Sequence, residues 1–359
     1  LGGYILYEIQ SGDTYYNIAQ RYNTSVLAIE TANPGLSYNN LEVGQKITVP
    51  ITESVTVTDL DYNSYLVGAI AEGIKKRYPF IELFYLGKSV WGNMIYLIKA
   101  GAGEKQIFIN AEHHANEWIT TPLVFKFTED FLKAYTEGGE ISGFSAREIY
   151  NNITLFSVAS VNPDGIDIVN DAVGGEWYES VKRISENYEN IPFPSGWKAN
   201  ANGVDLNLNY PAGWERAREI KFSQGFTSPA PRDFVGMSPL SQPESIAIYD
   251  LTVKSTFMLT ISYHTQGEVI YWKYQDFEPE NSFEIGKILA DVSGYELSLT
   301  PPLSSYAGYK DWFIQTYNKP GYTVEVGLGN NPLPISDFDE IYEKNLPLMA
   351  NALKIVSDM

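Results

Sequence analysis

The chain has 359 residues, of which 25 are basic and 44 are acidic, so its formal net charge at pH 7 is −19. Such a charge repels nucleic-acid phosphates and anionic lipid surfaces. Hydrophobic residues make up 44% of the sequence, and no apolar run approaches the roughly 20 residues of a membrane-spanning helix. The composition therefore predicts a folded chain without a membrane span and argues against a nucleic-acid partner.

The sequence contains no cysteine. Disulfides and thiolate ligands are thus excluded, and any metal must be bound by histidine and carboxylate side chains. The chain starts at Leu1 without a basic segment followed by an apolar stretch. A secretion signal is therefore expected to be absent, already removed or outside this sequence.

Residues 1–50 are predicted to form a small domain with the order strand, helix, helix and strand. Alternating residues indicate a first strand over residues 4–10, and residues 46–50 indicate the last. Apolar residues at helical spacing indicate two short helices around Ile18 and Ile29 between these strands.

This segment resembles a LysM domain through its Gly-Asp-Thr, Asn-Pro and Leu-x-x-Gly-Gln motifs, which occur in that order. LysM domains bind N-acetylglucosamine-containing glycans in a groove between the loop after the first strand and the loop before the last. The resemblance implies that the groove is bordered by Gly12, Asp13, Thr14, Asn33, Pro34 and Gly35. The alternative is that these residues only begin and end the two helices, and both interpretations can hold together.

Residues 51–61 are predicted to be a linker, and residues 62–359 an α/β domain. Candidate strands cover residues 105–111, 152–158, 257–263 and 322–326, and candidate helices cover residues 63–76, 118–135, 241–255 and 282–293. Apolar strands that alternate with helices predict a mixed, twisted sheet flanked by helices. Ser241 and Glu244, with Pro243 between them, predict a capping box at the start of the third of these helices.

Two of the three histidines lie in the segment A-E-H-H-A-N-E-W, directly after a predicted strand. His114 and Glu117 are three residues apart, so their side chains converge if the chain turns helical there. His264 ends another predicted strand, and ligands collect at the carboxyl ends of strands in open α/β sheets. Two imidazoles and one carboxylate are typical of a catalytic zinc site, which keeps a position for water. Alone, however, His-x-x-Glu also recurs by chance on helix surfaces.

Residues from about 62 onward resemble a zinc metallocarboxypeptidase domain. The motifs that carry the resemblance are G-K-S-V-W-G-N (87–93), H-A-N-E-W (114–118), N-P-D-G (162–165), G-V-D-L-N-L-N (203–209), S-Y-H-T-Q (262–266), K-D-W (310–312) and Y-T-V-E-V (322–326). The resemblance implies one Zn²⁺ per chain, bound by His114, Glu117 and His264. It also implies that Glu325 takes a proton from water and passes it to the leaving amine; without the motif, Glu325 would be a charge facing solvent at a strand end. His113 points away from its neighbour and is expected to be structural or to support the site.

Several positions depart from the family pattern. Asn116 and Leu208 each stand where the family has an arginine that contacts the substrate, whereas Asn207 is retained. Leucine cannot form a bidentate pair with a terminal carboxylate, so ordinary carboxypeptidase specificity is not expected. Lys198 stands where another family arginine stabilises the oxyanion, and it keeps the charge.

Two further residues are candidates for the site. Tyr306 is the candidate for the family's mobile tyrosine. Arg232, in a loop stiffened by prolines, is the candidate anchor for a substrate carboxylate, whereas Arg216 and Arg218 are expected at the surface.

The combination resembles bacterial γ-D-glutamyl-L-diamino acid endopeptidases, especially in W-K-A-N-x-x-G-V-D-L-N and P-A-G-W-E. It implies zinc-dependent hydrolysis of the bond between D-glutamate and the diamino acid of peptidoglycan stem peptides, with the LysM domain bound to wall glycan. A location in the bacterial wall or outside the cell is expected, with the cytoplasm or a spore compartment as alternatives. The alternative functions are a zinc carboxypeptidase acting on free peptides and a wall-binding protein with an inactive peptidase domain.

Overall fold

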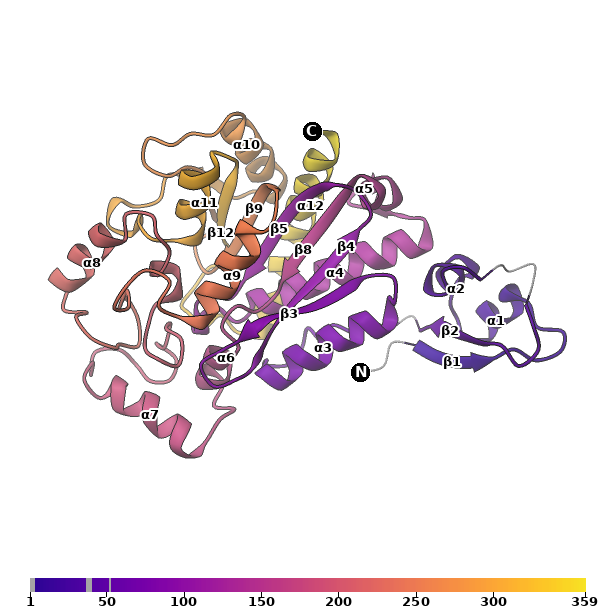
Figure 1. The fold of residues 1–359 in the computed structure, drawn as a ribbon, viewed down its shortest axis with the longest axis horizontal. Helices are drawn as coiled ribbons and strands as arrows, with labels where there is room; N and C mark the ends of the chain where they lie inside the picture. Colours follow the sequence, from indigo (N-terminus) through magenta and orange to yellow (C-terminus); the bar gives the residue numbers. More distant parts are fainter. Residues whose placement is uncertain (1–3, 37–40, 52) are drawn as a thin grey trace.

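The computed structural model describes residues 4–36, 41–51 and 53–359, which form a small N-terminal part and a much larger body (Figure 1). The small part contains β1 (Tyr4–Glu8), α1 (Tyr15–Arg21), α2 (Val26–Ala32) and β2 (Lys46–Pro50). β1 pairs with β2 in an antiparallel register, and the helices cover this ribbon to bury Ile18, Ile29 and Val49. The predicted order of strand, helix, helix and strand is confirmed.

The larger body is built on an eight-stranded mixed sheet with the order β11-β10-β12-β9-β5-β8-β4-β3. Its strands are β3 (Glu82–Lys88), β4 (Met94–Gly101), β5 (Lys105–Ala111), β8 (Ile153–Val158), β9 (Phe257–His264), β10 (Val269–Tyr271), β11 (Glu296–Ser298) and β12 (Gly321–Glu325). β12, β9, β5 and β8 run parallel at the centre. The antiparallel pairs are β10 with β12, β4 with β8, and β3 with β4. A two-stranded ribbon of β6 (Glu140–Ile141) and β7 (Phe144–Ser145) lies apart from this sheet.

Helices cover both faces of the sheet (Figure 1). They are α3 (Ser64–Arg77), α4 (Thr120–Glu137), α5 (Ala146–Asn152), α6 (Pro163–Val169), α7 (Gly175–Ser185), α8 (Trp214–Ser223), α9 (Pro243–Val253), α10 (Ser282–Ser293), α11 (Tyr309–Tyr317) and α12 (Phe338–Asp358). In β5, Ile107 and Ile109 face the core beneath α3, α4 and α12, whereas Phe108 faces the core beneath α9 and α11. Burial on both faces explains why the central strands are apolar without polar alternation.

The start of α9 differs from the prediction. Gln242 occupies the N-cap position and no side chain caps the helix, so the capping box predicted from Ser241 and Glu244 is wrong. Asn209 Nδ2 donates to Ser241 Oγ, and Val90 N donates to Glu244 Oε1. Both side chains are therefore engaged by distant segments rather than by their own helix.

The segment that joins the two parts is held against the body. Glu129 on α4 is buried, and its carboxylate accepts hydrogen bonds from Ser54 Oγ, Val55 N and Thr56 N at 2.7–2.8 Å. Residues 54–56 are thus fixed by one side chain. Among the described residues, no helix combines the length and apolarity needed to cross a membrane.

Candidate metal centre and active-site cleft

Sheet register brings the metal-ligating candidates to one edge. His114 and Glu117 follow the end of β5, with Glu117 in a short 3-10 turn, and His264 is the last residue of β9. β5 and β9 are parallel neighbours, so their carboxyl ends meet. Glu325 ends β12, the next parallel strand, and is paired directly with His264. Four residues from three distant segments of the sequence therefore lie together.

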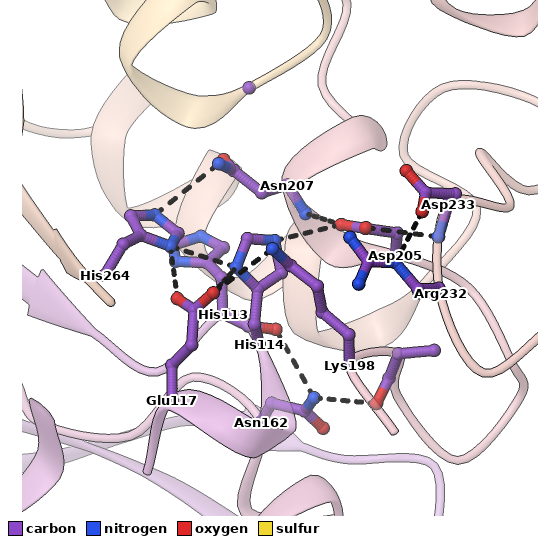
Figure 2. A network of polar contacts seen from close by, with 12 residues as sticks. His113, His114, Glu117, Asn162, Lys198, Asp205, Asn207, Arg232, Asp233 and His264 are labelled. Atoms are coloured by element: carbon purple, nitrogen blue, oxygen red, sulfur yellow. Dashed lines mark hydrogen bonds and ion pairs between the residues drawn. The ribbon is translucent and has the colours of Figure 1, made fainter. Parts of the chain in front are cut away.

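The side chains of His114, Glu117 and His264 converge on one point (Figure 2). Glu117 Oε1 lies 3.0 Å from His114 Nδ1, and Glu117 Oε2 lies 2.8 Å from His264 Nδ1. The two Nδ1 atoms lie 3.0 Å apart, and all three residues are at most 6% exposed. A buried cluster of two imidazole nitrogens and one carboxylate is the donor set that Zn²⁺ prefers in catalytic sites.

Asp205 supports this donor set. Its Oδ1 lies 3.1 Å from His114 Nε2, so that nitrogen donates to the carboxylate and Nδ1 is left with a free lone pair. A carboxylate behind a histidine is the usual outer partner of a metal-binding imidazole. The residues present therefore fit a zinc ion held by His114, Glu117 and His264.

Two carboxyl groups at the site have opposite electrostatic environments. Burial alone would raise the pKa of Glu117, but the charges of His114 and Lys198 outweigh it and hold that pKa well below its usual range. Burial, and then the charge of Glu117, raise the pKa of Glu325 to about 8. Glu117 thus stays a carboxylate, whereas Glu325 can exchange a proton near neutral pH.

The cleft beside the cluster has two halves. We call the half of about 250 Å³ the deep recess; its walls include His114, Leu208, Thr323 and Lys310. The half of about 590 Å³ is the outer groove, with walls that include Asn116, Asn190, Gln266, Asn330 and Asn331. Four residues border both halves: Lys198, Arg232, Tyr271 and Glu325. The reaction centre therefore lies where the two halves meet.

The predicted cationic residues reach the cleft. Lys198 Nζ lies 3.2 Å from Glu117 Oε1, beside the cluster (Figure 2). Arg232 borders the cleft with 43% of its side chain exposed, while its Nε donates to Asp233 Oδ2 at 2.6 Å. Both cations are thus placed where a substrate carbonyl or carboxylate can meet them.

The amide and apolar candidates have different surroundings. Asn207 Nδ2 lies 3.5 Å from His264 Nε2, and Asn207 Oδ1 accepts a hydrogen bond from Tyr309 N. Leu208 lines the deep recess and packs against Trp214. Asn116 lines the outer groove, where its Nδ2 donates to a main-chain oxygen at 3.3 Å.

Tyr306 and His113 are not among the side chains that converge on the metal-binding point. Tyr306 lines a separate recess with Lys273 and Gln275, and the structure does not bring it to the metal-ligating side chains. His113 is fully buried, and its Nε2 lies 2.9 Å from the hydroxyl of Tyr210.

The predicted glycan-binding residues divide into two kinds. Gly12, Pro34 and Gly35 are exposed. The others serve the fold as well: Thr14 caps α1, and Asp13 accepts hydrogen bonds from Tyr7 and from the main chain. The side chain of Asn33 is buried and bonded to main-chain groups of α2 and β2.

Sequence reasoning missed several residues of the cleft. Asp205 lies inside a motif that carried the family resemblance, yet no role was predicted for it. Lys310 and Asp311 also lie in such a motif, and Tyr271 and Lys221 lie in none. The cleft is assembled from distant segments. Only the motifs G-V-D-L-N-L-N and K-D-W could therefore have indicated Asp205, Lys310 and Asp311.

Comparison with known proteins agrees with this geometry. Residues 67–347 match the family model described as zinc carboxypeptidase, and residues 7–50 match the LysM domain model. "Gamma-D-glutamyl-L-diamino acid endopeptidase 1" of Lysinibacillus sphaericus is 44% identical over 280 residues, which cover 78% of this chain and 69% of the relative.

Two further proteins are similar to this chain. "Uncharacterized protein YqgT" of Bacillus subtilis is 40% identical over 292 residues, covering 79% of this chain and 76% of that protein. The crystal structure of thrombin activatable fibrinolysis inhibitor has a TM-score of 0.65 at 19% identity, covering 86% of this chain and 80% of the other. At that identity the likeness concerns the fold alone.

Proposed function

The chain belongs to the zinc carboxypeptidase family, and from this membership we propose that it hydrolyses the γ-D-glutamyl-diamino acid bond of peptidoglycan stem peptides. The observation that carries the proposal is the 44% identity to a relative named for this bond. Leu208 supports it, because leucine in the deep recess cannot hold the terminal carboxylate on which a carboxypeptidase depends.

We assign the proton transfers to Glu325. A zinc ion, when bound, supplies Lewis-acid polarisation and makes water a stronger acid. Glu325 takes the proton from the attacking water and returns it to the nitrogen of the leaving diamino acid. Its position suits both steps, because Glu325 is paired with the metal-ligating His264 and lines the cleft that receives the substrate.

Other residues of the cleft position the substrate. Lys198 places an ammonium beside Glu117, where it stabilises negative charge on the scissile carbonyl oxygen. Arg232 borders both halves of the cleft, and we assign to it the free α-carboxylate of D-glutamate, the residue that also carries the scissile γ-amide. Asp205 holds the ring of His114, and Asn207 lies beside the ring of His264.

We propose that the LysM domain keeps the enzyme on wall glycan. It raises the effective concentration of stem peptides at the cleft without contributing to the chemistry. This places the protein in contact with the bacterial wall.

Digestion of the tripeptide L-Ala-γ-D-Glu-meso-diaminopimelate, with products identified by mass, tests the proposal. We expect L-Ala-D-Glu and free diaminopimelate, and no products after chelation. Removal of terminal residues from ordinary L-peptides, with the tripeptide untouched, would instead establish a carboxypeptidase of free peptides. Zinc binding without hydrolysis of either substrate would establish an inactive wall-binding protein.

A further inference from the structure

The deep recess contains an ion pair that has no part in the proton transfers. Lys310 Nζ lies 2.7 Å from Asp311 Oδ1, and it donates a hydrogen bond of 2.8 Å to the main-chain oxygen of Lys273. Lys310 and Asp311 are only 4% and 3% exposed. Charged side chains are rarely buried so deeply, and these two line a recess of substrate size rather than the core.

The pair is placed beyond the reaction centre by the start of α11. Asn207 Oδ1 accepts a hydrogen bond of 3.0 Å from Tyr309 N, which fixes that helix start beside His264. Thr323, which also lines the deep recess, lies two residues before Glu325 on the same face of β12. A substrate group that passes Glu325 and enters the recess therefore meets Lys310.

The two halves of the cleft suit the two halves of the substrate. The D-glutamate side of a stem peptide continues into the glycan, so it must leave the cleft through the larger outer groove of about 590 Å³. The diamino acid side chain of an uncrosslinked stem ends freely, so it can fill the deep recess of about 250 Å³. The ion pair then faces the far end of that side chain.

Resting on the proposed function, we infer that Lys310 and Asp311 select diaminopimelate over lysine as the diamino acid. The diaminopimelate side chain ends in an ammonium and a carboxylate, whereas the lysine side chain ends in an ammonium alone. Lys310 has three N–H groups; one donates to the main-chain oxygen of Lys273, and even with another directed at Asp311 one is left for the substrate carboxylate. Asp311 keeps lone pairs that accept from the substrate ammonium.

The same pair disfavours lysine. A lysine side chain would bring an ammonium next to Lys310 without a second carboxylate to offset the two positive charges. Repulsion is strong at a site with so little exposure to water, because screening is weak there. Amidation of the far carboxylate of diaminopimelate removes the same negative charge and should have a similar effect.

The test measures kcat/KM of the zinc-loaded full chain on three tripeptides that differ only in the third residue: diaminopimelate, its far-end amide, and lysine. We expect the wild type to prefer diaminopimelate about 10- to 100-fold over each of the others, as one charged hydrogen bond allows. Lys310→Met should lower kcat/KM for diaminopimelate by a similar factor and leave the lysine tripeptide unchanged or better cleaved. The ratio of the kcat/KM values for the three tripeptides is measured on one preparation of each variant, so partial misfolding does not affect it.

Lys221→Met is the matched control, since Lys221 is another buried lysine that lines the deep recess, where it pairs with Asp233. It should keep the wild-type ratio even if its activity changes. Asp311→Asn should lower kcat/KM on all three tripeptides, because each of them carries an ammonium at the far end of the third residue. Equal cleavage of the three tripeptides by the wild type, or an equal loss on all three in Lys310→Met, would overturn the inference. Failure of the wild type to cleave any of them would overturn the proposed function itself.

Discussion

His264 and Glu325 are directly paired residues on neighbouring parallel strands, at the last position of β9 and the last position of β12. The register of the sheet therefore fixes a metal-ligating side chain and a proton-carrying side chain next to one another. Neither residue depends on a flexible loop for its placement, which favours a preformed site.

His264→Ala should abolish zinc binding. The variant keeps only His114 and Glu117 from the convergent set, and two ligands hold zinc poorly. Bound zinc at about 1,000 times its dissociation constant stabilises a fold by about 4 kcal/mol, so chelation should lower the melting temperature of the wild type but not of the variant. His113→Gln is the control, because His113 stacks on His264 and lies within hydrogen-bond distance of Tyr210 but is not one of the convergent ligands. Equal zinc content in His264→Ala and wild type would contradict the assignment.

Glu325→Gln should retain zinc and lose turnover. The amide cannot take or return a proton, so kcat should fall by a factor on the order of 10²–10⁴. Metal content by mass spectrometry and tripeptide hydrolysis are the two measurements. The exposed Glu280→Gln serves as the matched control and should keep full activity. A Glu325→Gln enzyme with near-normal kcat would rule out Glu325 as the proton carrier.

Glu244 should make stability depend on pH. Burial raises its pKa from 4.5 to about 7, so between these values the unfolded chain is ionised at this position while the folded chain remains protonated. Its contribution to stability is complete below pH 4.5 and falls as the pH rises to about 7. At about 1.4 kcal/mol per pH unit, the loss is about 3 kcal/mol.

Glu244→Gln should remove this dependence, because glutamine carries the donor and acceptor of the protonated acid. Denaturant unfolding of both proteins at several pH values between 4.5 and 7 gives the comparison. We expect the wild type to lose about 3 kcal/mol more than the variant across this range. Parallel stability curves for the two proteins would show that the pKa of Glu244 is not raised in the fold.

Regular elements and the metal cluster were accessible from the sequence, because both have local or motif-based signals. The apolar run of β5 and the His-x-x-Glu spacing directly after it belong to one short segment. The family resemblance adds His264 to this segment. Together they predicted that the side chains of His114, Glu117 and His264 converge, as the structure shows. The βααβ order of residues 4–50 was likewise predictable from turn and periodicity signals.

The remaining features depend on tertiary contacts that no local pattern records. Ser241 and Glu244 form a good capping sequence, but Asn209 and Val90 bind them instead. Tyr306 lies in a loop, and its sequence does not say which recess its ring enters. Lys310 is visible in the K-D-W motif, yet its burial in the cleft is defined only when α11 packs beside β12.

Loss of the hydrogen bonds to Glu129 should impair hydrolysis of insoluble peptidoglycan without impairing catalysis itself. The three hydrogen bonds from residues 54–56 hold the segment that follows the LysM domain, and α2 of that domain also packs against α4. Glu129→Ala leaves two main-chain N–H groups without this acceptor, so the segment should open more often. A local loss of about 2 kcal/mol would raise its cleavage by a protease about 30-fold.

The same variant should hydrolyse a soluble tripeptide at the wild-type rate but insoluble peptidoglycan more slowly. A LysM domain held in one orientation presents wall substrate to the cleft without the entropic cost of ordering the linker, and a released domain incurs that cost. Glu137→Ala, an exposed change near the end of the same helix, is the control for both assays. An equal loss on the two substrates would indicate damage to the catalytic body, and no change in proteolysis would show that Glu129 does not hold the segment.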